Sequence, residues 1–372
     1  MNNLTVLEWN DEIIASLIPN IVVLSVYLLV GISGNVLVLL VYACQMKNSS
    51  DERYFIPILA ACDLIATVYL GSFGIYNSIH QVTYSNYNLC KITSFFRGLA
   101  TFIPTCVLLI IAIQRYFKIC MKLNHSTTLV FKRVSLVLAN LCSIMVAMPL
   151  PFVTELIPVH SSTYKITGWR CGSSTKGNNF ARNVYFIVVG LFVVVTVTTF
   201  IVLYARITYT IFGHFKKRRH QKDKKGNKSN IREKNVENIK ENQEDLTICD
   251  FSTNSHETES NENNQTATVS KQSESVKRQR KDRDLTYKMA IMFFVITLVF
   301  FICYTPKLIM IILAGIYKDF VEKLSNSERS AVLFVYDMQI INNIVNPFIY
   351  AFMDIMFRKE AKTLLKGVFT FK

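Results

Sequence analysis

Seven long apolar segments are the feature that most constrains the fold of this chain. The hydrocarbon core of a membrane is roughly 30 Å thick, and a helix rising about 1.5 Å per residue crosses it with about 20 apolar residues. Lipid offers the backbone no hydrogen bonds, so each segment is predicted to be an α-helix. The segments are 18–43, 55–79, 90–117, 134–157, 183–212, 286–314 and 330–353. The chain is therefore predicted to be an all-α membrane protein, a seven-transmembrane helix bundle.

The distribution of basic residues predicts how these helices are oriented. Residues 1–17 contain no Lys or Arg, whereas the loop at 118–133 contains four and residues 216–219 read Lys-Lys-Arg-Arg. Because basic loops stay on the cytosolic side, the N-terminus is predicted to lie outside and the C-terminal tail inside. The basic residues that produce the net charge of +15 are therefore expected to lie at the membrane surface, and no nucleic-acid partner is expected.

The predicted helices divide the chain into five parts. These are an outer N-terminus at 1–17, the first five helices at 18–215, a third cytoplasmic loop at 216–284, the last two helices at 285–356, and a tail at 357–372. The third loop has one aromatic residue, Phe251, and too little apolar surface to offset ordering, so it is predicted to be disordered. The basic ends of this loop are expected to bind anionic lipid headgroups, and they could contact a cytosolic partner as well. The tail alternates apolar and basic residues at helical spacing, which predicts a short amphipathic eighth helix on the membrane face.

Three features belong to the predicted outer side. Of nine cysteines, Cys90 and Cys171 are the pair that falls outside, where disulfides persist, so a bridge between them is predicted. It would join the third helix to the loop at 158–182. Residues 164–171 of that loop partly alternate in polarity, which favours a hairpin. Asn3 opens an Asn-Leu-Thr sequence, a candidate glycosylation acceptor.

Polar residues inside the spans are costly in lipid and therefore mark candidate functional sites. They are Asn35, Asp63, Asn342, Asn343 and Asn346. A carboxylate at mid-depth must be protonated, paired or hydrogen-bonded, and neighbouring amides would serve. Such a cluster can bond helices together or hold a small cation, and the residues alone leave both possibilities open.

Three further positions indicate movement or anchoring. Pro347 removes a backbone hydrogen bond from the seventh span, which predicts a hinge or a kink needed only for packing. Tyr350, one turn later, is suited to changing partners near the cytosolic end. Arg115, at the inner edge of the third span, either extends toward the headgroups or takes part in a switch.

Together these residues resemble the rhodopsin-like (class A) G-protein-coupled receptors, and within them the peptide receptors. The resemblance covers nearly all of the chain except the N-terminus and the third loop. The matching residues are Gly34-Asn35, Asp63, Cys90, Gln114-Arg115-Tyr116, Tyr204 with Ile207, Phe300, Cys303-Tyr304, Pro306, Asn346-Pro347, Tyr350 and Phe357-Arg358. Each match is weak alone, but their order along the chain, one group per helix, is specific.

The resemblance implies a plasma-membrane receptor with an extracellular N-terminus, and no enzyme activity. A ligand would bind between the outer ends of the helices and shift the balance between two states. The sixth helix would swing about Pro306, and a heterotrimeric G protein would insert. Arrestin and a kinase would act through the third loop, with membrane lipids as further partners. The implied switch residues are Gln114, Arg115, Tyr116, Tyr204, Phe300, Pro306, Asn346, Pro347 and Tyr350.

Departures from the family pattern generate further hypotheses. Gln114 replaces the acid that usually pairs with Arg115, and Thr286 stands where many members have an acidic partner. Both changes weaken the resting state, so raised basal signalling is expected. No cofactor is expected apart from an allosteric sodium ion at Asp63, and Pro104 stands where a serine usually helps to bind it.

Two cations bear on the ligand. Arg97 occupies the position where receptors for amines carry an aspartate, and Lys307 directly follows Pro306. They predict an acidic group on the ligand, either a neuropeptide-type ligand or a small organic acid. Tyr304 and Tyr336 are the other candidate ligand contacts.

Alternatives stay open for the two cations and for the class of protein. The cations could instead pair internally, with Asp337 or Glu155. A chemosensory receptor of the same fold is an alternative, and a seven-helix transporter is a weaker one because no paired broken helices are visible. A retinal pigment would need a Lys in the seventh span, and 330–353 contains none.

Overall fold

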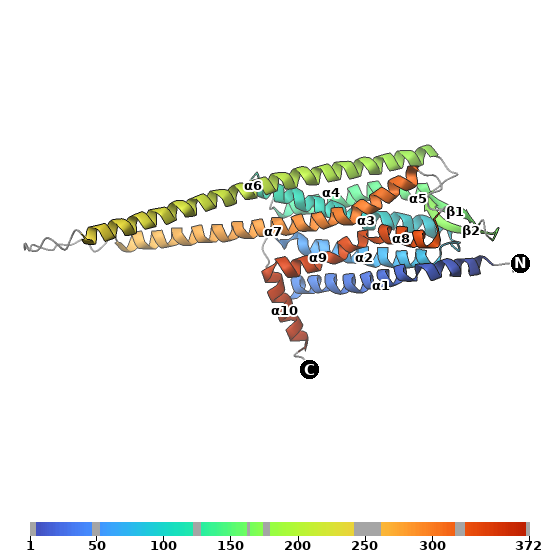
Figure 1. Ribbon diagram of the computed structural model, residues 1–372, viewed down its shortest axis with the longest axis horizontal. Coiled ribbons are helices and arrows are strands. Elements are labelled where there is room, and N and C mark those ends of the chain that lie inside the picture. The colour runs from blue at the N-terminus through green and yellow to red at the C-terminus, as the bar shows by residue number, and fades with distance from the viewer. Residues whose placement is uncertain are drawn as a thin grey trace, which may run out of the picture. The chain divides into compact units, whose positions relative to one another are not determined.

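The computed structural model describes residues 5–46, 53–121, 128–161, 164–173, 179–241, 262–316 and 324–369. Its helices are α1 (Val6–Cys44), α2 (Phe55–Ile79), α3 (Tyr87–Ile119), α4 (Leu129–Ala147), α5 (Leu150–Val153), α6 (Asn179–Glu241), α7 (Glu262–Ile316), α8 (Asn326–Asp337), α9 (Gln339–Met353) and α10 (Ile355–Phe369), and its strands are β1 (Thr154–His160) and β2 (Thr167–Ser173) (Figure 1). The chain forms two compact units, Met1–Tyr204 with Lys288–Lys372, and Ala205–Tyr287.

The first unit is the expected bundle of membrane-spanning helices. Among the described residues, six helices are long and apolar enough to cross a membrane. The seventh crossing is α8 followed by α9, because Met338 between them keeps helical backbone angles. At Asp354 the chain turns by 100°, and α10 leaves the bundle as the predicted eighth helix (Figure 1). The chain is a multi-pass membrane protein.

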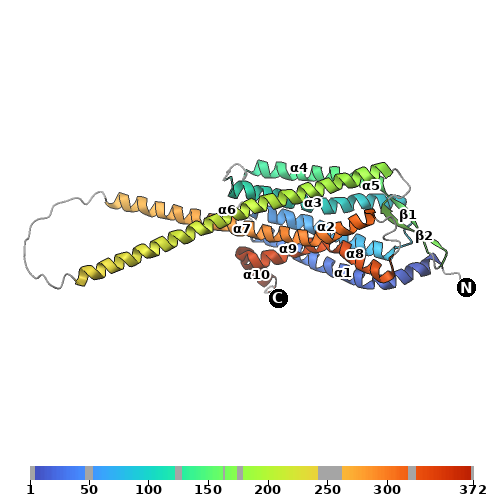
Figure 2. The same cartoon turned by 45° about the horizontal axis from the view of Figure 1, so that its top comes forward.

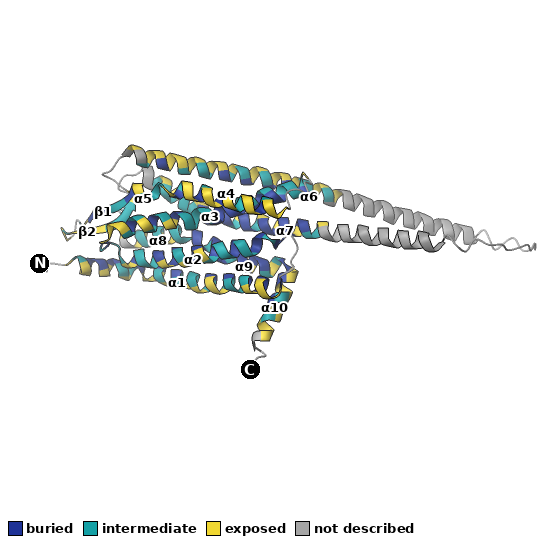
Figure 3. Ribbon diagram, turned by 180° about the vertical axis from the view of Figure 1, so that it is seen from behind, coloured by how far each residue is buried: buried dark blue, intermediate teal, exposed yellow. Residues whose placement is uncertain are grey.

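Exposed residues, yellow in Figure 3, follow α4 and the first part of α6, and many of them are apolar. Val130, Leu141, Leu191 and Val195 are each more than half exposed. In water such a surface would be a liability, whereas lipid chains solvate it. These faces are therefore the bilayer-facing side of the bundle.

The first helix begins at Val6, twelve residues earlier than the predicted span at 18. A capping box explains the early start. Thr5 Oγ accepts a hydrogen bond from the amide of Glu8 at 3.3 Å, and Glu8 Oε2 accepts one from the amide of Thr5 at 2.7 Å. Trp9, Ile13 and Leu17 then bury their side chains against the α2–α3 loop and β1.

The fourth span ends earlier than predicted at its C-terminal end. Instead of running to 157, the helix stops at Ala147, α5 adds one turn, and β1 starts at Thr154. Pro149 and Pro151 explain the stop, since each removes a backbone donor and disfavours helical angles in the residue before it. Glu155 consequently lies in a strand outside the span.

The predicted hairpin is present, and it is longer than the loop pattern indicated. β1 and β2 are antiparallel, with Leu156 opposite Cys171. The α2–α3 loop pairs with β2: Trp169 donates to Val82 O at 2.7 Å, and Tyr84 donates to Trp169 O at 3.0 Å. A Cβ at Gly168 would lie 2.5 Å from Val82 O, so this close approach requires glycine. Figure 2 shows the hairpin at the same end of the bundle as the start of α1, here called the hairpin end.

The predicted disorder of 216–284 is wrong for the described part of that segment. Helix α6 continues to Glu241 and α7 starts at Glu262, while residues 242–261 lie outside the described ranges. Composition excluded a packed core here, but it did not exclude a helix. Lys, Glu, Gln and Arg are good helix formers, and lengthening an existing helix avoids the cost of nucleation.

Close helix packing around Gly31 makes a stability prediction. A Cβ at Gly31 would lie 2.5 Å from Thr67 Cγ2 and 2.6 Å from Ile344 Cγ2, both branched side chains of neighbouring helices. We expect Gly31→Ala to lower the free energy of unfolding by about 1–3 kcal/mol through overpacking. The measurement is the melting temperature of the purified protein in detergent.

Gly190→Ala is the matched control, because no atom lies within 4 Å of a Cβ placed there. Its higher helix propensity should leave the stability unchanged or raise it by up to about 1 kcal/mol. Equal melting temperatures for the two variants would contradict the packing described around Gly31.

Candidate functional site

The polar residues predicted inside the spans form one buried cluster across three helices. Asn346 Nδ2 of α9 donates to Asp63 Oδ2 of α2 at 2.6 Å. Asn35 Nδ2 of α1 donates to Gly31 O and to Asn343 O of α9, both at 3.0 Å. Since Asp63, Asn35 and Asn346 are fully buried, these bonds lie wholly within the bundle and hold α1, α2 and α9 together.

The same cluster contains buried oxygens that no donor in the described part of the chain reaches. They are Asn35 Oδ1, Asp63 Oδ1, Thr67 Oγ1, Asn342 Oδ1 and Asn346 Oδ1. Buried oxygens of this kind are satisfied by water or by a hard cation. The cluster therefore bonds helices together and also contains oxygen acceptors that a small cation could use. Both roles raised by the sequence, helix bonding and cation binding, are compatible with it.

The proline of the seventh span lies between this cluster and the end of α9. A Cβ at Gly34 would lie 3.1 Å from the ring of Pro347, so α1 packs directly against the weakened turn. Tyr350 is fully buried one turn later, with its ring 6.1 Å from that of Phe357 in α10. Its hydroxyl has no hydrogen-bond partner among the described residues. Packing, rather than a polar bond, holds Tyr350 in place.

Arg115 does not extend toward the headgroups. It is 1% exposed, and its guanidinium lies over the ring of Phe293 of α7, 5.1 Å from the ring centroid. Gln114 beside it is also buried. This contact joins α3 to α7 near the end of the bundle where α10 leaves, here called the α10 end.

Tyr204 makes a second link to the same stretch of α7. Its hydroxyl donates to Phe293 O at 3.2 Å and accepts a hydrogen bond from Thr297 Oγ1 at 3.0 Å. One turn further along α7, the ring of Phe300 lies 6.0 Å from that of Phe200 and 4.4 Å from that of Tyr304. Sequence reasoning missed Thr297; its only signal was a hydroxyl in an apolar helix.

The two candidate ligand cations lie toward the hairpin end. Arg97 is exposed and its guanidinium lies 5.7 Å from the centroid of the Phe73 ring. Lys307 Nζ donates to Gln339 Oε1 at 2.5 Å. Asp337 attracts both cations electrostatically, yet no ion pair within 4.0 Å joins it to either among the described residues. Lys307 is thus hydrogen-bonded to an amide, and the internal pair with Asp337 is long-range.

The two tyrosines proposed as ligand contacts differ in position. Tyr336 is half-buried and interacts electrostatically with Arg97, which places it with the cations. Tyr304 is buried against Phe300, and Asp63 acts on its hydroxyl, which places it with the deeper polar cluster. Gln339 and Tyr185 also surround the cations, and neither was identified from the sequence.

The hairpin end is held by a disulfide and by α1. The predicted bridge between Cys90 of α3 and Cys171 of β2 is present, with a Cα–Cα distance of 5.5 Å. Asn10 of α1 donates to Ile79 O at 2.8 Å and accepts from the amide of Val82 at 3.1 Å. Tyr164 donates to Glu12 Oε2 at 2.9 Å, and this bond raises the pKa of Tyr164. The hairpin is therefore fixed against α3, the α2–α3 loop and α1.

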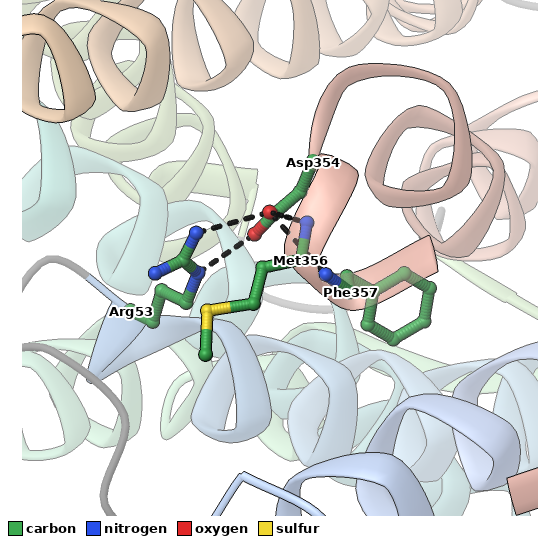
Figure 4. A network of polar contacts seen from close by, with 4 residues as sticks. All are labelled: Arg53, Asp354, Met356 and Phe357. Carbon is green, nitrogen blue, oxygen red and sulfur yellow. Dashed lines mark hydrogen bonds and ion pairs between the residues drawn. The ribbon is translucent and has the colours of Figure 1, made fainter. Parts of the chain in front are cut away.

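The α10 end contains an ion pair that sequence reasoning missed. Arg53, just before α2, donates from Nε to Asp354 Oδ2 at 2.8 Å and from Nη2 to Asp354 Oδ1 at 3.0 Å. Both side chains are buried. Asp354 Oδ1 also accepts from the amides of Met356 and Phe357 at 3.0 and 3.3 Å, which caps α10 (Figure 4).

Some predicted positions are not brought into these groups. Tyr116 is half-buried, with its ring 6.0 Å from that of the adjacent Phe117. Pro306 lies within α7, half-buried. Asn3 lies outside the described residues, so its glycosylation stays a prediction. No group of three or more His, Cys, Asp or Glu side chains suited to a metal occurs among the residues that the structure describes.

Comparison with known proteins gives the family. Residues 34–350 match the model of the 7 transmembrane receptor (rhodopsin family). The chain is 23% identical to the guinea-pig (Cavia porcellus) cholecystokinin receptor type A over 360 residues, which cover 94% of this chain and 80% of that receptor. It is 27% identical to human (Homo sapiens) olfactory receptor 51F2 over 146 residues, 37% of this chain and 43% of that receptor. The chain belongs to the rhodopsin family of seven-transmembrane, G-protein-coupled receptors, and it is not an enzyme.

Proposed function

We propose that this receptor lies in the plasma membrane with its hairpin end outside, binds an acidic ligand of peptide type there, and activates a heterotrimeric G protein at its α10 end. The observation that carries the proposal is that Arg97 and Lys307 both interact electrostatically with one described carboxylate, Asp337, while Lys307 is hydrogen-bonded to Gln339 and Arg97 lies by Phe73. Two cations and one acid leave a net positive charge, which attracts an anionic ligand group and repels an amine.

The proposed ligand site is built by several helices. Arg97 comes from α3, Lys307 from α7, and Tyr336 and Asp337 from α8. Arg97 is exposed, and it interacts with the ring of Phe73 and electrostatically with Tyr185. Its planar guanidinium suits a bidentate bond to a carboxylate, whereas Lys307 would add a point charge.

Helix α7 offers a physical route from the ligand to the G protein. Lys307 lies near one end of its membrane-spanning part, and Phe293, which covers Arg115, lies roughly 20 Å away along the helix. Pro306 weakens the helix next to Lys307. An anion drawn toward Lys307 would favour a different tilt of α7, and the contact between Phe293 and Arg115 would open. A ligand acts only through such a difference in affinity between two states.

The class of ligand has two candidates. Similarity over nearly the full length to a cholecystokinin receptor supports a peptide-type ligand, and the hairpin fixed beside the site would contact it. Similarity of a shorter segment to an olfactory receptor supports a chemosensory receptor for a small organic acid. A screen of peptides against small acids, with G-protein nucleotide exchange as the readout, separates the two. Arrestin and a kinase, acting through the third loop, and membrane lipids are proposed as further partners.

The cation pair makes a prediction about potency. For any acidic agonist that the screen finds, Arg97→Gln and Lys307→Gln should each lower potency by about 10- to 100-fold, because each removes one charged hydrogen-bond donor. The measurement is the agonist concentration for half-maximal nucleotide exchange. Lys91→Gln is the matched control, since Lys91 lies on the same helix as Arg97 and contacts Tyr87 instead. Unchanged potency in both variants would remove the acidic-ligand proposal.

Gln114 makes a prediction about basal signalling. An acid here would pair with Arg115 and stabilise the state in which α7 covers that arginine, so Gln114→Asp should lower nucleotide exchange without ligand. Gln114→Asn introduces an uncharged side chain of the same size as aspartate, and it should not lower nucleotide exchange without ligand. A basal rate that stays the same in Gln114→Asp, at equal receptor number, would show that the missing acid does not raise basal activity.

We also propose that a sodium ion binds in the buried polar cluster. Asp63 Oδ1 and Asn342 Oδ1 are oxygen acceptors without donors among the described residues, which suits a hard cation, and Pro104 contributes no side-chain oxygen. The ion would neutralise Asp63 within the bundle. Sodium chloride should therefore raise the melting temperature of the wild type more than potassium chloride does, and Asp63→Asn should abolish the difference. Equal effects of both salts on the wild type would exclude the site.

A further inference from the structure

The function proposed above assigns no role to the ion pair between Arg53 and Asp354. It lies away from the ligand cations and from the bond between Asp63 and Asn346. Burying two charges costs much of the energy that their attraction returns, so a buried pair contributes little to stability compared with apolar side chains of the same volume. Its two-point geometry fixes position and direction instead.

Asp354 fixes three segments through one carboxylate. Arg53 connects it to the chain just before α2, and the amides of Met356 and Phe357 connect it to the first turn of α10 (Figure 4). Asp354 itself has an extended backbone, with φ −102° and ψ 103°, at the point where the chain turns by 100°. The direction in which α10 leaves the bundle is therefore set by this residue and its partners.

Phe357, in the first turn of α10, transmits this geometry to the switch. Its ring lies 6.1 Å from that of Tyr350 and 6.5 Å from that of Tyr42 of α1. Tyr350 has no hydrogen bond from its hydroxyl to a described residue, so the packing of Phe357 restrains it. In the same arrangement Arg115 is covered by Phe293, which keeps α3 and α7 together at the α10 end.

We propose that Arg53 and Asp354 are positioning residues of the receptor switch: their ion pair holds Phe357 against Tyr350, and breaking it favours the signalling state. The proposal rests on the proposed function for its signalling readout, whereas the positioning itself is measurable without a G protein. Neither residue contacts the ligand or the G protein in this mechanism, since both act through Phe357.

The test uses the full-length receptor in lipid nanodiscs at matched receptor number. Asp354→Asn removes the charge but keeps Oδ1 as an acceptor for the two amides of α10, and Arg53→Gln removes the other charge. Each should raise basal nucleotide exchange by about 2- to 30-fold, and the double variant should exceed neither by much. Arg358→Gln is the control: it makes the same charge change on an exposed residue of α10 and should leave the rate unchanged.

Hydrogen exchange of the α10 amides in the receptor alone is the second measurement. Both single variants should exchange faster over 355–361 than the wild type, and Arg358→Gln should not. Unchanged protection in both would overturn the positioning role, whatever the signalling result. Faster exchange without a rise in basal signalling would overturn the link to Tyr350. If the wild type activates no G protein but the two variants show the expected faster hydrogen exchange, the proposed function is contradicted and the positioning role is supported.

A second variant covers the case in which the charge variants fail to fold. Phe357→Leu leaves the ion pair intact and removes the aromatic ring that packs against Tyr350. It should therefore raise basal nucleotide exchange by itself. An unchanged basal rate in Phe357→Leu would overturn the proposal by itself. Where Asp354→Asn folds, combining the two changes should add nothing further, because both act through the same contact. Additive effects would show that Asp354 acts by another route and would overturn the proposal.

Discussion

The absence of water in the hydrocarbon core is the constraint on which the rest of this structure depends. It forces the backbone into uninterrupted helices and makes every buried polar side chain find a partner or remain costly. The apolar faces of α4 and α6 are turned outward, toward lipid. Three groups of polar side chains stand out among the described residues: the bond between Asp63 and Asn346, the cations Arg97 and Lys307, and the pair of Arg53 with Asp354. Each group lies at a different depth, and each joins helices that are distant in sequence.

The groups are connected mainly by α7 and α9. Helix α7 contains Lys307, Tyr304, Phe300 and Phe293 in succession, so one helix extends from the ligand cations to the cover of Arg115. Helix α9 leads from the polar cluster to Tyr350 and the turn at Asp354. Both helices contain a proline, which removes a backbone hydrogen bond and permits a change of direction. A shift at the hairpin end can therefore reach the α10 end through packed side chains, without breaking the bundle.

Much of this arrangement could be predicted from the sequence because lipid makes polar residues conspicuous. The bridge between Cys90 and Cys171 and the approach of α9 to Asp63 both follow from such residues, and the structure contains both contacts. The start of α1 was missed because hydropathy alone ignores the capping box at Thr5, although its residues were visible. The strand at Thr154 is not predicted, because hydropathy counts the whole apolar segment with its two prolines as one span.

Other features could not be derived from local pattern. Arg53 and Asp354 are 301 positions apart, and Arg53 in a basic loop looks like any residue that fixes topology. The packing of Arg115 on Phe293 depends on how α3 meets α7, which spacing does not specify. The helical ends of the third loop show that low apolar content excludes a core but not a helix. What remained hidden was the choice of partner, since this depends on three-dimensional packing.

In the proposed function, activation separates α7 from α3 at the α10 end and uncovers Arg115. The most direct measurement is the distance between spin labels at Lys118 of α3 and Lys288 of α7, in nanodiscs with and without a nucleotide-free heterotrimeric G protein. The account predicts that the distance increases by several ångströms when the G protein binds, about half a helix diameter of roughly 10 Å. A bound G protein with an unchanged distance would contradict it.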